Sequence, residues 1–156
     1  MKGLIDMQAS DAAKELIKEF EGCSLQAYLC PAKVWTIGYG ATGQHVRKGV
    51  IWSLEMAEKD LDARLFVLSS RLWHHLIKHH SGKTSQPQFD ALISFAYNFG
   101  IRALLDSTLF HHHLEADYSA AAKEFGKWIY AGTPKKKLPG LVRRREAEAA
   151  LYWRGS

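Results

Sequence analysis

A carboxylate, a thiol and a hydroxyl stand at short spacings near the start of the chain, in the segment FEGCSLQAYLCPAKVWTIGYG. Glu21 ends an apolar helical segment, and Cys30 and Thr36 follow on what the composition predicts to be paired strands. Cleaving a glycosidic bond requires one carboxyl group that supplies a proton and a second group that handles water or the oxocarbenium-like charge. Glu21 is the candidate acid, and Cys30 and Thr36 are candidates for positioning the water. The segment therefore favours glycoside cleavage.

Each of these features also has an ordinary structural interpretation. A solvated glutamate, a small buried cysteine and a strand-forming threonine would explain the same residue types. Aromatic neighbours, among them Trp35 and Tyr39, would shelter Glu21 and keep it protonated near neutral pH. Gly38 and Gly40 would let the backbone approach a sugar closely, or they would mark a bulge.

The elements that would hold these residues follow from the hydrophobic pattern. Apolar residues at helical spacing predict helices over residues 9–21, 53 to between 79 and 82, 85–100, 107–116, 119–130 and 141–153. Ser10 or Asp11 would cap the first helix and Gly22 would end it, while Ser85 and Gln88 would form a capping box. Residues 25–50 are rich in aromatic and β-branched types, which predicts a small antiparallel sheet with its turn at residues 31–33.

The length and composition indicate one compact unit. The chain has 156 residues, of which 47% are hydrophobic, and a formal net charge of +5. We expect a single α+β domain over 1–156, with a sheet-bearing lobe (about 1–52), a connecting helix (about 53–80) and a helical lobe (about 81–156). The default place for a substrate would be the cleft between the lobes.

Three ordered motifs resemble the phage-type lysozymes, the endolysins related to the lysozyme of the T-even coliphages. The first is Glu21, eight residues, Cys30, five residues, Thr36, followed by Ile37-Gly38-Tyr39-Gly40. The second is the segment QFDALISFAYNFG over residues 88–100, and the third is Trp128 to Gly132 followed by GLVRRREAE over residues 140–148. The resemblance covers roughly residues 14–153.

This resemblance implies a lysozyme-like fold and hydrolysis of the β-1,4 bond between N-acetylmuramic acid and N-acetylglucosamine in peptidoglycan. Glu21 would be the catalytic acid, Cys30 would occupy a position that more often holds Asp, and Thr36 would help to hold the water. The substrate-binding candidates implied by the match are Gly40, Tyr97 and Asn98. No cofactor, metal or nucleic acid is implied, and we expect a monomer.

The departure at Cys30 leaves the chemistry open. A neutral thiol is a poor base, whereas a thiolate could orient water or attack carbon. One rival interpretation is a lytic transglycosylase that leaves 1,6-anhydro products. Another is a module that binds the wall without cutting it. The intact spacing of Glu21, Cys30 and Thr36 argues against pure binding.

The N-terminal residues show no export signal, and no apolar run is long enough to span a bilayer. We expect synthesis in the host cytoplasm, action in the periplasm or cell wall, and release by a separate holin-type partner. Lys135–Lys137 and Arg143–Arg145 form a basic C-terminal region. This region is predicted to be a solvated surface with one arginine packing its stem on the core. Its functional alternative is attraction to anionic wall or outer-membrane polymers.

Two further patterns are weighed against simpler explanations. Cys23 could form a disulfide with Cys30, but the favoured prediction is that it packs near the helix end. His75 and His79 stand one helical turn apart, and residues 111–113 are consecutive histidines. No flanking ligand pattern accompanies them, so we expect no physiological metal site.

Overall fold

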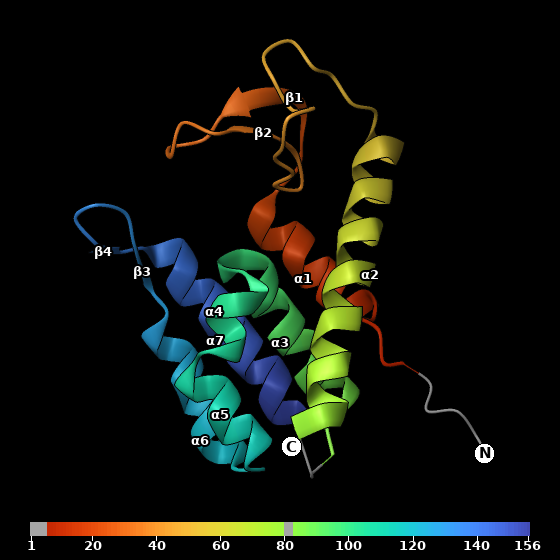
Figure 1. Cartoon of the computed structure of the whole chain (residues 1–156). Helices are drawn as coiled ribbons and strands as arrows, with labels where there is room; N and C mark the ends of the chain where they lie inside the picture. Colours follow the sequence, from red (N-terminus) through yellow and green to blue (C-terminus); the bar gives the residue numbers. More distant parts are fainter. Residues whose placement is uncertain (1–5, 80–82) are drawn as a thin grey trace.

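The structure is a computed structural model that describes residues 6–79 and 83–156. Its elements in chain order are α1 (Asp11–Glu21), β1 (Ser24–Leu29), β2 (Trp35–Gly38), α2 (Leu54–His79), α3 (Gln86–Phe99), α4 (Ile101–Leu105), α5 (Thr108–Leu114), α6 (Tyr118–Glu124), the 3₁₀ turn η1 (Phe125–Lys127), β3 (Tyr130–Ala131), β4 (Lys136–Lys137) and α7 (Pro139–Arg154). The small sheet lies at one end, the helices gather at the other, and α2 runs along their side (Figure 1). The predicted α+β class is confirmed.

Helix α1 carries Glu21 as its last helical residue. Ser10 caps the helix through its side-chain oxygen, and Gly22 ends it at φ +68°. The backbone N–H of Ser10 also donates to Asp90 of α3 at 2.9 Å, which fixes the start of α1 against the helical lobe. Both predicted ends of α1 are confirmed. Because the start of α1 is fixed to α3, the position of Glu21 relative to the helical lobe is fixed as well.

Strands β1 and β2 form an antiparallel hairpin in which Tyr28 pairs with Thr36. The register is irregular between Ser24 and Tyr28. A small core of its own supports the hairpin, made of Ala27, Ile37, Ala41 and Val46. The predicted sheet and its turn are confirmed.

The apolar residues that predicted helix α2 are buried except Leu68, which is only partly buried; the buried ones are Ala57, Leu61, Leu65, Leu72 and Leu76. It is described through His79, and the part of the predicted helix end at residues 80–82 lies outside the described residues. Among the described residues, no helix combines the length and the apolar character needed to cross a bilayer.

Helix α3 is the centre of the helical lobe, packed against α1, α2, α4 and α7. Its predicted capping box, formed by Ser85 and Gln88, is confirmed. Nine successive residues from Gln88 to Ala96 are buried, which is typical of a helix covered on all sides. The sequence missed α4 and the two-residue strands β3 and β4, which pair as a short hairpin where a basic loop was predicted.

Candidate active site

Glu21 is held by an arginine from the far end of the chain. Its Oε1 lies 2.6 Å from Nη1 of Arg144 in α7, and the Arg144 side chain is only 3% exposed. The Glu21 side chain is 21% exposed, so it sits at the boundary between the interior and solvent. The ion pair fixes one carboxylate oxygen and leaves the other, Oε2, without a hydrogen-bond partner among the described residues.

A buried network fixes Arg144 in turn. Its Nη2 donates to the Ser94 carbonyl at 3.1 Å, and its Nε donates to Glu148 Oε2 at 3.3 Å. Arg145 Nε lies 2.8 Å from the other Glu148 oxygen, and the hydroxyl of Ser94 donates to Glu148. Burial raises the pKa of Glu148, and the two arginines oppose that shift. Glu148, Arg144 and Arg145 therefore form a buried network that fixes the Arg144 guanidinium beside Glu21.

Gly40 lies directly against the free oxygen of Glu21. A Cβ at this position would stand 3.2 Å from Glu21 Oε2, and the backbone has φ +90°, where side-chain-bearing residues are strained. The preceding residue, Tyr39, accepts a hydrogen bond from the hydroxyl of Tyr97 through its carbonyl. Burial raises the pKa of Tyr97, and the charge of Glu21 adds to the shift. Gly40 and Tyr97 thus lie within the immediate surroundings of the candidate acid.

Asn98 and Glu21 line one groove with the N-terminal end of α7. The groove has a volume of about 590 Å³ and also includes Phe20, Gly140 and Arg143. The Asn98 amide oxygen accepts from Arg145 Nη2 at 2.9 Å, which fixes its orientation. A space of this size suits a ligand site.

Cys30 and Thr36 meet on the hairpin. A hydrogen bond from the Val34 backbone N–H lowers the pKa of the Cys30 thiol, and the Ala32 N–H and the Thr36 hydroxyl add to this shift. The Thr36 hydroxyl lies 3.0 Å from the Val34 carbonyl and is also near the Cys30 sulfur, so its single proton can be donated to either group. These contacts therefore stabilise the thiolate form of Cys30, and burial opposes their effect on the pKa of the thiol. Among the described residues, no hydrogen bond or ion pair joins this pair to Glu21.

Comparison with known proteins identifies the family. The phage lysozyme family matches residues 18–148. The chain belongs to the phage lysozyme family. The chain is 37% identical over 148 residues to an endolysin of Acyrthosiphon pisum secondary endosymbiont phage 1, covering 94% of this chain and 98% of that one.

Solved structures agree in fold. The endolysin from Escherichia coli O157:H7 phage FAHEc1 superposes with a TM-score of 0.84 at 34% identity, covering 94% of this chain and 93% of that chain. The muramidase domain of SpmX from Asticaccaulis excentricus gives 0.77 at 34% identity, covering 93% and 97%. The lysozyme-like fold is confirmed, and the chain is a lysozyme-type glycoside hydrolase of the kind that degrades bacterial cell walls.

The structure differs from the sequence-based predictions for the surroundings of Glu21 and for the basic C-terminal region. Aromatic side chains were expected to shelter Glu21, but its partner is Arg144, and the Tyr39 hydroxyl donates to Glu58 at 3.0 Å instead. The basic C-terminal region was predicted to be solvated with one packed arginine. Instead Arg144 and Arg145 are both buried ion-pair partners. The spacing Arg-Arg-x-x-Glu on one helix was the signal that could have revealed this.

The remaining cysteine and histidine predictions have separate outcomes. Cys23 was predicted to pack, but it is exposed, and both cysteines are free. The rings of His75 and His79 lie 4.5 Å apart. His113 is a core residue that contacts Tyr152 and Thr84 through hydrogen bonds. Within the described ranges, no group of three or more His, Cys, Asp or Glu side chains could hold a metal ion.

Proposed function

We propose that this phage lysozyme is an endolysin that hydrolyses the β-1,4 bond between N-acetylmuramic acid and N-acetylglucosamine in peptidoglycan. The observation that carries the proposal is the position of Glu21, fixed by buried Arg144 through one oxygen and open through the other beside Gly40. A general acid must lie within hydrogen-bond reach of the atom that it protonates, and the contact with Arg144 holds the carboxyl group in one place with Oε2 free for that transfer.

In this proposal Glu21 Oε2 delivers a proton to the glycosidic oxygen as the bond to the anomeric carbon breaks. A water molecule, oriented by the Cys30 thiolate and the Thr36 hydroxyl, adds to that carbon and gives its proton to the thiolate. Proton exchange with solvent then restores the acid form of Glu21 and the thiolate of Cys30. The lowered pKa of the Cys30 thiol supports this role because the thiolate, unlike the neutral thiol, can orient water and accept its proton. Gly40, Tyr97 and Asn98 would contact the glycan along the groove.

Muropeptide analysis of digested sacculi tests the proposal. We expect wild-type protein to release reducing muropeptides. We expect Glu21→Gln to release none while remaining folded, as shown by a cooperative thermal unfolding transition. Glu15→Gln, an exposed glutamate on the same helix, is the matched control and should act like wild type. Products lighter by one water would instead indicate a transglycosylase. An unchanged wall profile with wild-type protein would favour a binding module.

Three narrower expectations stay predictions. They are a holin-type release partner, attraction of the exposed basic residues to anionic wall polymers, and a monomeric state.

A further inference from the structure

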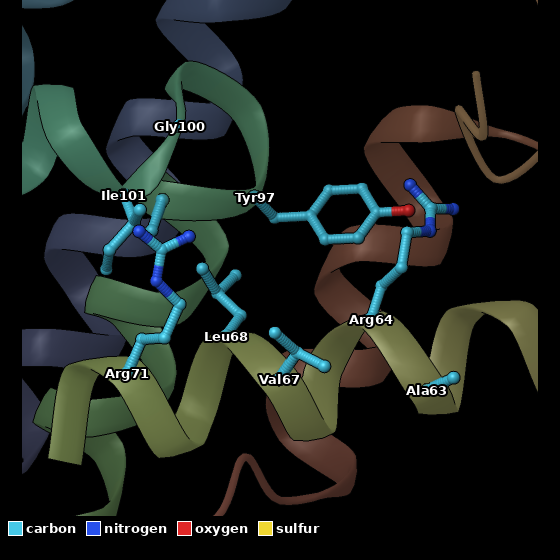
Figure 2. A pocket seen from close by; sticks show the side chains of 9 residues that line it. Ala63, Arg64, Val67, Leu68, Arg71, Tyr97, Gly100 and Ile101 are labelled. Carbon is cyan, nitrogen blue, oxygen red and sulfur yellow. The ribbon is translucent and has the colours of Figure 1, made fainter. Parts of the chain in front are cut away.

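The backbone carbonyl of Tyr39 accepts hydrogen bonds from two helices at once. The Tyr97 hydroxyl of α3 donates to it, and Nη2 of Arg64 in α2 donates to it at 3.3 Å. A carbonyl oxygen has two lone pairs, so these two donors use both of them. Figure 2 shows the Arg64 and Tyr97 side chains pointing toward one another from their two helices. Because Tyr39 directly follows β2, this one oxygen atom joins the sheet-bearing lobe to both helices.

Arg64 is itself held in a defined orientation. Its Nε and Nη2 lie 2.9 Å and 2.7 Å from Oδ2 of Asp60, one turn earlier on α2. Its guanidinium carbon lies 4.9 Å from the centroid of the Tyr97 ring, a distance at which the ring face attracts a cation. Burial raises the pKa of the Tyr97 hydroxyl, although the charge of Arg64 opposes that shift, so the hydroxyl keeps its proton and remains a donor. Arg64 therefore supplies one donor and packs against the ring that carries the other.

The two hydrogen bonds act next to the open oxygen of Glu21. The Tyr39 carbonyl and the Gly40 N–H belong to one planar peptide unit, so fixing the carbonyl fixes the Gly40 backbone as well. A Cβ at Gly40 would stand 3.2 Å from Glu21 Oε2. Any rotation of this peptide unit therefore changes the space beside Oε2. Among the described residues, no hydrogen bond or ion pair joins Arg64 to Glu21 itself.

We propose that Arg64 is a positioning residue for the candidate acid. Together with Tyr97 it fixes the peptide unit between Tyr39 and Gly40, which sets the space in which the glycosidic oxygen must lie beside Glu21 Oε2. Such geometry has a large effect on rate, since a misplacement of about 1 Å costs about 100-fold. This inference rests on the proposed function, because it assigns one more residue to the same reaction.

The Gly40 amide reports on this contact independently of what the protein cleaves. Its N–H shares a peptide unit with the Tyr39 carbonyl, so its ¹⁵N and ¹H chemical shifts respond to the hydrogen bonds that the carbonyl accepts. We expect Arg64→Gln to move the Gly40 signal, and Asp60→Asn, which keeps the arginine but removes its partner, to move it less. Arg71→Gln, an exposed arginine seven residues farther along α2, is the matched control and should leave the signal in place. An unchanged Gly40 signal in Arg64→Gln would overturn the proposal.

Kinetics on soluble, uncross-linked peptidoglycan separate positioning from a merely structural role. The assays are run below the unfolding transition of every variant, so that all of the protein is folded. We expect Arg64→Gln to lower kcat about tenfold and to leave KM within about twofold, because the contact acts at the reacting bond rather than on binding. Arg71→Gln should keep both constants. A wild-type kcat in Arg64→Gln, or a loss confined to KM, would overturn the proposal.

Failure of the proposed function would look different. Wild-type protein that releases no reducing muropeptides, or a Glu21→Gln variant that does release them, would contradict the proposed function. In either case the Gly40 signal of Arg64→Gln would still decide whether Arg64 fixes the peptide unit beside Glu21.

Discussion

Replacing Arg144 by glutamine is the sharpest test of the buried network behind the candidate acid. The change removes the ion pair to Glu21 at 2.6 Å and the hydrogen bonds to Glu148 and the Ser94 carbonyl. Glu148 is fully buried, and it would keep Arg145 as its remaining cation. Arg144→Gln should therefore both destabilise the fold and free Glu21 to move.

The magnitude follows from the burial of the partners. Removing one partner of a buried ion pair costs about 3–5 kcal/mol, and the lower value applies here because Arg145 still neutralises Glu148. A loss of about 3 kcal/mol lowers the unfolding midpoint of a chain of this size by roughly 6–12 °C. Of that loss, about 1–2 kcal/mol should be the coupling to Glu21, since a charged hydrogen bond at a partly exposed site is worth about that much.

Urea unfolding followed by tryptophan fluorescence measures these terms. A double-mutant cycle compares wild type, Arg144→Gln, Glu21→Gln and the double variant. The free energy of unfolding that the double variant loses should be about 1–2 kcal/mol smaller than the sum of the two single losses. Arg143→Gln is the matched control, since Arg143 is exposed, and its stability should stay within about 0.5 kcal/mol of wild type. An Arg144→Gln protein as stable as Arg143→Gln, or a cycle without coupling, would refute the reasoning.

Three further changes probe the site. Gly40→Ala should reduce wall-lytic activity more than tenfold, because its Cβ would stand 3.2 Å from Glu21 Oε2, whereas Gly49→Ala has a similar φ and nothing within 4 Å and should keep activity. The rate at which iodoacetamide alkylates Cys30 should rise with pH with a midpoint below the ordinary thiol pKa of about 8.5. Wall-lytic activity should be lost in proportion to the alkylated fraction. A hydrogen bond from a lysine holds the pKa of Glu58 at about 2, so its stabilising effect is present above about pH 4.3, its unfolded value, and is lost as the pH falls toward 2. The unfolding midpoint of Glu58→Gln should thus fall less than that of wild type between pH 5 and pH 2.5.

Each of these changes has a control and a contradicting result. Equal activity losses in the two glycine variants would mean that backbone strain, rather than contact with the acid, is responsible. A Cys30→Ser protein, which keeps the other thiol, should lose the low-pH alkylation phase, and its persistence would disprove the assignment. Glu55→Gln, exposed on the same helix as Glu58, should follow wild type through the acid range, and a Glu58→Gln curve parallel to both would count against the ion pair.

Most of the fold could be predicted from short segments of sequence. The sequence predicted the cap at Ser10, the capping box at Ser85 and the apolar face of α2, because each depends on residues within a few positions of one another. Helix α4 could not be predicted because only Gly100 separates it from α3, and a glycine at this position is typical of a helix end. The β3–β4 hairpin was missed because two-residue strands carry no periodicity.

By itself, the sequence determined the family and the fold class of the protein, and it gave Glu21, Cys30 and Thr36 as candidates for its chemistry, since their spacing is a local property. Only the tertiary structure decided how Glu21 is held. Its partner Arg144 lies 123 positions away in sequence, and the pairing exists because α3 brings α1 and α7 to the same place. The sequence predicted that one arginine of this region would pack on the core, whereas the structure buries both Arg144 and Arg145, because Glu148 and Glu21 neutralise their charges there.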